Sequence, residues 1–195
     1  MTTPVLVRHY PALPVDRAEI ARYALSPGHE PPHLSEALAE AEGAVRNAVA
    51  YCVFPVRDEG DEIDLGFAKT ASRDLRRALA GCDRVLLFAA TVGAGMDRLV
   101  ARYSLLSPAK AQLFQAIGAE RVEALCDAFC RDMKADFPTL RPRYSPGYGD
   151  LPLAFQRDVF AALDPVKRLG LTLNESDLMT PTKSVTALAG IGGNE

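Results

Sequence analysis

The residues best suited to chemistry lie in one short segment in the last third of the chain. Residues 138–152 contain four prolines and two glycines, with Arg143, Tyr144 and Tyr148 between them. An arginine on a stiff loop presents a planar fork of N–H donors to a carboxylate, and a glycine such as Gly147 lets the backbone approach a ligand. The segment is therefore predicted to be a binding loop for a molecule with an amino-acid group.

Acidic side chains on a predicted long helix form a second candidate site. Glu120, Glu123 and Asp127 are spaced three or four residues apart, so they share one face of that helix. Such a row binds a metal or another cation, or is simply a solvated face, and the solvated face is the usual case. Glu123 is the member closest to the apolar stripe, which makes it the candidate binding residue. No metal site is predicted.

His29-Glu30-Pro31-Pro32-His33 has the letters of the H-E-x-x-H motif of zinc proteases. That motif needs both histidines on one face of a helix, and two consecutive prolines between them forbid the helix. We predict a surface loop without zinc. The cysteines lack C-x-x-C spacing and are predicted to be buried structural thiols; they are Cys52, Cys82, Cys126 and Cys130.

Gly93-Ala94-Gly95 follows a predicted strand and precedes a predicted helix. Glycines in that position can bring backbone N–H groups to a nucleotide, but the third glycine of the full motif is replaced by Arg98. A tight structural turn is favoured, and a cofactor-binding loop remains the alternative.

Hydrophobic periodicity predicts the elements that must position these residues. The predicted helices cover residues 16–24, 34–49, 72–80, 95–103, 107–137 and 153–163. The predicted strands cover residues 52–56, 62–65, 85–90, 171–173 and 184–191. This order indicates an α+β fold, with helices packed around a small, mainly antiparallel sheet.

Arg143-Tyr144-Ser145-Pro146-Gly147-Tyr148 resembles the R-x-x-x-G-Y signature, commonly R-P-A-P-G-Y, by which the reactivation domain of cobalamin-dependent methionine synthase binds S-adenosylmethionine. The resemblance extends from about Gln115 to Ile191. Three further blocks match in order: Glu123-Ala124-Leu125, Leu173-Asn174-Glu175-Ser176 and Ser184-Val185-Thr186.

The resemblance implies one domain over residues 1–195, helices against a twisted sheet, with the motifs in 107–195. It also implies a pocket for S-adenosylmethionine, in which Arg143 holds the carboxylate of the ligand, Gly147 gives close backbone approach, and Tyr148 lines the wall. Glu123 faces the ammonium or the sulfonium, and Tyr144 and Pro146 complete the motif. The family adds an aspartate from its N-terminal arm, for which the candidates here are Asp16, Asp58, Asp61 and Asp64.

The implied activity needs a partner, because the chain has no cobalamin-binding D-x-H-x-x-G motif. Cobalamin is expected on a separate methionine synthase core. A low-potential donor, flavodoxin or ferredoxin, supplies an electron to inactive cob(II)alamin, and S-adenosylmethionine then methylates the reduced cobalt. The protein positions the methyl donor and excludes water.

Composition limits the other possibilities. The chain has 195 residues, with 22 Lys and Arg against 25 Asp and Glu, so its net charge of -3 gives no basic field for nucleic acid. No apolar run is long enough to span a membrane and no signal peptide is visible, which predicts a cytoplasmic protein. Two alternatives stay open: an autonomous S-adenosylmethionine-dependent methyltransferase of a small molecule, using Gly93–Gly95, and a non-catalytic assembly subunit of a corrinoid system.

Overall fold

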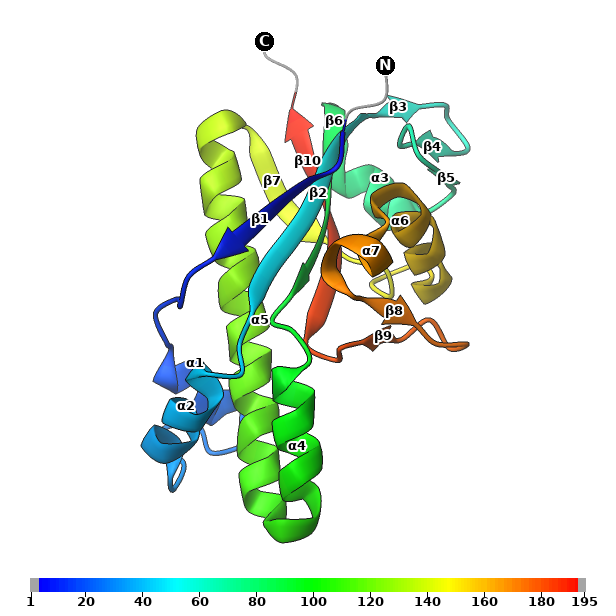
Figure 1. Ribbon diagram of the computed structural model, residues 1–195. Coiled ribbons are helices and arrows are strands. Elements are labelled where there is room, and N and C mark those ends of the chain that lie inside the picture. Colours follow the sequence, from blue (N-terminus) through cyan, green and yellow to red (C-terminus); the bar gives the residue numbers. More distant parts are fainter. Residues whose placement is uncertain (1–3, 193–195) are drawn as a thin grey trace.

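A computed structural model describes residues 4–192, and an antiparallel sheet of five strands runs through its centre (Figure 1). The strands lie in the order β1–β2–β6–β10–β7, and every neighbouring pair is antiparallel. Their bounds are β1 Leu6–Tyr10, β2 Asn47–Pro55, β6 Cys82–Thr91, β7 Leu140–Tyr144 and β10 Ser184–Gly192. Five two-residue strands lie outside this sheet: β3 Arg57–Asp58, β4 Ile63–Asp64, β5 Lys69–Thr70, β8 Thr172–Leu173 and β9 Met179–Thr180.

Helices cover both faces of the sheet. One face packs against α1 Arg17–Tyr23, α2 Leu34–Glu42, α4 Gly95–Leu106 and α5 Pro108–Asp136. The other packs against α3 Arg73–Ala78, α6 Gln156–Leu163 and α7 Pro165–Leu169, with a short 3-10 turn at Leu153–Phe155. The central strands are therefore buried on both sides, which is why the run from Val85 to Ala90 is apolar without alternation.

The long helix α5 is the largest element of the layer formed by α1, α2, α4 and α5. Ser107 caps it by accepting a hydrogen bond from the Lys110 backbone N–H at 3.4 Å, and Pro108 occupies the first helical position. Phe129 on α5 packs on the sheet, with its ring centroid 5.0 Å from that of Phe88 and 5.1 Å from that of Tyr51. In Figure 1 the lower half of α5 runs beside α4 and extends past the end of the sheet.

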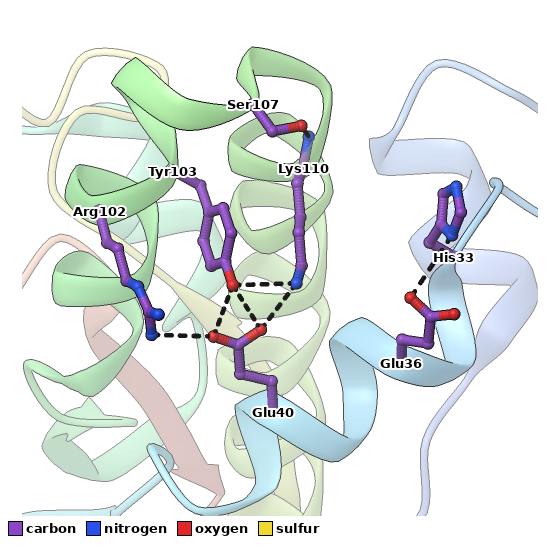
Figure 2. A network of polar contacts seen from close by, with 7 residues as sticks. All are labelled: His33, Glu36, Glu40, Arg102, Tyr103, Ser107 and Lys110. Carbon is purple, nitrogen blue, oxygen red and sulfur yellow. Dashed lines mark hydrogen bonds and ion pairs between the residues drawn. The ribbon is translucent and has the colours of Figure 1, made fainter.

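Glu40 on α2 fastens that helix to α4 and α5 (Figure 2). Its carboxylate accepts a hydrogen bond from Lys110 Nζ at 2.8 Å and from the Tyr103 hydroxyl at 3.0 Å, and it forms an ion pair with Arg102 at 3.5 Å. The hydrogen bond from Lys110 holds the pKa of Glu40 below its usual value. The position of α2 is thus set by a charged cluster as well as by its buried face.

The α+β class and the antiparallel sheet are confirmed, and so are the helices from Ser72, Gly95 and Ser107 and the strands at 85–90 and 184–191. The predicted helix over 34–49 is wrong in its second half, because α2 ends at Glu42 and β2 begins at Asn47. Val45 and Val49 continue the helical spacing by coincidence, and Val49 is instead a buried residue of β2.

The predicted loop over residues 138–152 is also partly wrong, since Leu140–Tyr144 form the edge strand β7. Pro142 is compatible with a strand there because it lies at an irregularity in the pairing with β10, and β7 is at the edge of the sheet. Hydrophobic periodicity did not predict β1, β3, β5, α7 and β9. Between residues 4 and 192, no helix has the length and apolar character needed to cross a membrane.

Candidate functional site

A cavity of about 350 Å³ opens where β7 ends. Arg143 and Tyr144 pair with Ala189 and Leu188 of β10, and then the chain turns away while β10 continues back to Ser184. Over residues 184–187, β10 pairs with β6 on one side only within the described chain, and Ser184, Val185 and Thr186 of this stretch line the cavity. The lining residues are Glu123, Arg143, Tyr144, Ser145, Pro146, Tyr148, Gln156, Met179, Ser184, Val185 and Thr186.

Five of the six predicted site residues therefore meet around this one cavity. Gly147 is not among the lining residues, but it shapes the turn that forms the rim, with φ of 90° and its N–H donating to the Leu151 carbonyl at 2.9 Å. That left-handed conformation favours glycine. Tyr148 follows it with 68% of its surface exposed, so its ring stands at the mouth of the cavity.

Arg143 is the charged centre of the site. Its guanidinium forms ion pairs with Glu123 and, at 2.5 Å, with Asp127, both on α5. Burial works against the charge of Arg143, but the hydrogen bond to Asp127 and the neighbouring Glu123 outweigh it, and the pKa of Arg143 is raised. These two pairs use two of the five N–H donors of the guanidinium.

The acidic side chains Glu120, Glu123 and Asp127 on α5 make two separate sets of contacts. Glu123 and Asp127 face Arg143, whereas the buried Glu120 pairs with Arg121 and accepts a hydrogen bond from the Asp16 backbone N–H at 3.0 Å. A neighbouring cavity of about 520 Å³ is lined by Asp16, Glu120, Glu123 and Asp127, among others. Asp16 is thus the N-terminal aspartate that shares a cavity with Glu123, while Asp58, Asp61 and Asp64 belong to the β3–β4 segment.

Asp150 anchors the far end of the loop to the start of α3. Its carboxylate accepts hydrogen bonds from the Ser72 hydroxyl and from the backbone N–H groups of Arg73, at 2.8 Å, and Asp74, at 3.2 Å. Asp74 in turn accepts the Asp150 N–H at 3.3 Å. These bonds, the one from Ser72 first, lower the pKa of Asp150. The loop is therefore held at one end by the pairing of β7 with β10 and at the other end by Asp150. We call the hydrogen bonds between Asp150 and the start of α3 the α3 clamp.

Several lining residues were not predicted as site residues. Thr186 donates to the Gln156 side-chain oxygen at 2.8 Å, and Gln156 Nε2 donates to the Asp177 carbonyl at 3.4 Å. Gln156 and Thr186 are buried polar side chains at the start of α6 and on β10. The Ser184-Val185-Thr186 block carried a signal in the resemblance, whereas Gln156 and Met179 had none because tertiary packing alone brings them here.

The remaining motifs lie away from this cavity. A Cβ at Gly95 would overlap the backbone of Ala44, so the Gly93–Gly95 segment is a packed structural turn, as favoured from the sequence. His29 and His33 lie in an exposed loop, where His33 approaches Glu36 at 3.4 Å (Figure 2). No group of side chains in residues 4–192 is arranged to hold a metal. Cys52 and Cys126 are buried as predicted, but Cys82 and Cys130 are only half-buried, which corrects that prediction.

The architecture defines a class: a five-stranded antiparallel sheet backed by one long helix, with a charged cavity at the end of an edge strand. Among solved structures, the MetH reactivation domain bound to AdoHcy has this fold, with a TM-score of 0.70 at 14% sequence identity over 99% of this chain and 80% of that one. At that identity the similarity establishes the fold. No family model and no curated protein matches the sequence.

Proposed function

We propose that this chain binds S-adenosylmethionine in the cavity at the end of β7 and supports reductive methylation of cobalamin on a separate methionine synthase core. Arg143, Glu123 and the turn at Gly147 surround one cavity, and this observation carries the proposal. The fold shared with the MetH reactivation domain supports it.

The charges of the site suit this ligand. Arg143 contributes one positive charge, and ionised Glu123 and Asp127 contribute two negative charges. S-adenosylmethionine has one negative carboxylate and two positive groups, the ammonium and the sulfonium, so cluster and ligand are complementary. The fork of Arg143 holds the carboxylate while Glu123 faces a positive group of the ligand.

When bound, S-adenosylmethionine supplies an electrophilic methyl group. The chain itself orients the ligand: β10 offers its open backbone edge over residues 184–187, and the Gln156–Thr186 pair forms a polar wall. Tyr148 lines the mouth of the cavity, where its ring would cover one side of a bound ligand. The residues present position the methyl donor, which is the part of the reaction assigned to this chain.

An autonomous methyltransferase is less well supported. That alternative needs a ligand against Gly93–Gly95, and the space beside Gly95 is filled by the backbone of Ala44.

Calorimetric titration with S-adenosylmethionine tests the proposal. Arg143→Ala removes a charge-assisted pair to the carboxylate, and we expect binding to weaken by about 1.5 to 3 kcal/mol, roughly 10- to 150-fold. Arg141→Ala is the matched control, because Arg141 lies on the same strand and outside the cavity. Equal affinities for the wild type and a folded Arg143→Ala variant would overturn the assignment.

A further inference from the structure

A further cavity, of about 590 Å³ and larger than the two described above, lies near the opposite edge strand, β1. Its wall is formed by the end of β1, the segment leading to α1, the second half of α2 and the middle of α5. None of its lining residues belongs to the cavity around Arg143. We call it the α2 cavity.

The wall of the α2 cavity is mainly apolar. Leu13, Leu38, Val45 and Ile117 contribute to it, together with alanines of α2. The part of the wall that α2 forms is held in position, because Glu40 joins that helix to α4 and α5 by hydrogen bonds (Figure 2). A preformed apolar cavity of this size is typical of sites that take small organic molecules.

Three polar residues in the wall have partners within the protein. Arg121 donates to the carbonyls of Leu13, at 2.8 Å, and Pro14, at 2.7 Å, and pairs with Glu120. The Tyr10 hydroxyl donates to Asp132 at 2.8 Å. Arg46 donates to two carbonyls of the α2–β2 connection, those of Gly43 at 3.1 Å and Val45 at 2.7 Å. These bonds hold the polar groups in the wall.

Asn47 differs from these residues. Its side chain is in the wall and only 8% of the residue is exposed. Nδ2 donates to the Pro11 carbonyl at 2.9 Å, whereas Oδ1 is buried without a hydrogen-bond partner among the described residues. A buried acceptor without a donor is unfavourable, so a donor supplied from the cavity would stabilise this arrangement.

We propose that the α2 cavity is a second ligand site, for a neutral, mainly apolar molecule that carries one N–H or O–H donor directed at Asn47. A charged ligand is disfavoured in the apolar part of the cavity, because the charges of Glu42 and Arg46 lie on exposed residues of its wall and the buried Arg121 is already paired with Glu120. This class of neutral ligands does not include the charged S-adenosylmethionine. The proposed second site therefore does not depend on the function proposed above.

Two fused-ring probes test this site: indole, which has an N–H donor, and benzothiophene, which has a similar shape and none. Binding is followed by the ¹H–¹⁵N spectrum of the full chain, including the side-chain amide of Asn47. Both probes are expected to shift signals of Val45, Asn47 and Ile117. The preference for indole relative to benzothiophene should fall about fivefold in Asn47→Leu, the equivalent of about one neutral hydrogen bond.

Ala39→Phe provides a second variant should Asn47→Leu not fold. Ala39 is exposed and lines the α2 cavity, so the new ring should obstruct it and reduce binding of both probes at least tenfold. Ala18→Phe, on the exposed side of α1 and outside the cavity, is the control. The proposal is overturned if neither probe shifts these signals, if Ala39→Phe binds like the wild type, or if the indole preference survives in Asn47→Leu. S-adenosylmethionine affinity should be unchanged in Ala39→Phe, which separates the two sites.

Discussion

Arg143 holds two carboxylates of α5 before any ligand is present, and this determines what a substitution there does. Its ion pairs orient the guanidinium across the cavity, so little side-chain freedom remains to be lost on binding. Removing the side chain also leaves Glu123 and Asp127 close to each other without their cation. The arginine therefore has one function in the folded chain and a second in the proposed complex.

Arg143→Lys separates these two functions. A lysine keeps the positive charge near Glu123 and Asp127, but a compact ammonium does not reproduce the two parallel donors of the fork. We expect the melting temperature to stay close to that of the wild type while affinity for S-adenosylmethionine remains weakened, close to that of Arg143→Ala. Calorimetric titration alongside a thermal melt measures both, and full recovery of affinity in the lysine variant would contradict the bidentate contact.

At the scale of elements, the α3 clamp joins two segments distant in sequence. The carboxylate of Asp150 binds the start of α3, and Gly149 beside it has φ of 52° and no room for a Cβ against Asp74 and Tyr144. The Tyr144 hydroxyl also donates to the Tyr148 carbonyl at 2.9 Å, within the same loop. The rim of the cavity is thereby held in its shape before a ligand arrives.

Asp150→Ala should loosen that rim without altering a lining residue. We expect affinity for S-adenosylmethionine to fall roughly two- to tenfold, because the loop must then be ordered on binding. Asp158→Ala, an acidic residue in the first turn of α6, is the control. An unchanged affinity in a folded Asp150→Ala variant would show that the clamp does not organise the site.

The same contact predicts a pH dependence. The pKa of Asp150 is lowered in the folded chain, chiefly by the Ser72 hydroxyl. Its contribution to stability is therefore complete above the ordinary aspartate pKa of about 4 and is lost as the pH falls through the lowered value. Melting curves between pH 7 and pH 3 should show a smaller acid-dependent loss of stability in Asp150→Ala than in the wild type.

The elements that the sequence predicts correctly are those whose signal lies within one segment of the chain. The caps and apolar stripe of α5 and the apolar run of β6 are contained in single segments, and both elements were predicted. The four prolines and two glycines of residues 138–152 predict a loop, whereas residues 140–144 form β7, an edge strand in which a proline is tolerated. The pairing of Arg143 with Asp127, and the arrival of Gln156 at the cavity, depend on tertiary packing and had no local signal.

At the scale of the whole molecule, the proposed function requires a second protein. A core of methionine synthase in the cob(II)alamin state, supplied with S-adenosylmethionine and a low-potential reductant such as flavodoxin or ferredoxin, should form methylcobalamin when this chain is added. The change is read from the visible spectrum of the corrinoid. Omitting the chain should abolish the conversion, Arg143→Ala should slow it at subsaturating ligand, and Arg141→Ala should not.

Two other outcomes would replace this assignment. If the core is reactivated equally fast without the chain, the chain has no part in reactivation. If the chain alone methylates a small molecule, the autonomous methyltransferase takes its place.

The open edge of β10 has a consequence for aggregation. Exposed strand edges can recruit strands from other chains, and proteins avoid this by keeping such edges short or obstructed. Here the unpaired stretch covers only residues 184–187, with β7 closing one end and the buried Pro181 and the turn before Ser184 at the other. The main-chain groups left unpaired beside the cavity thus form a short run that is blocked at both ends, which limits the room for a strand from another chain.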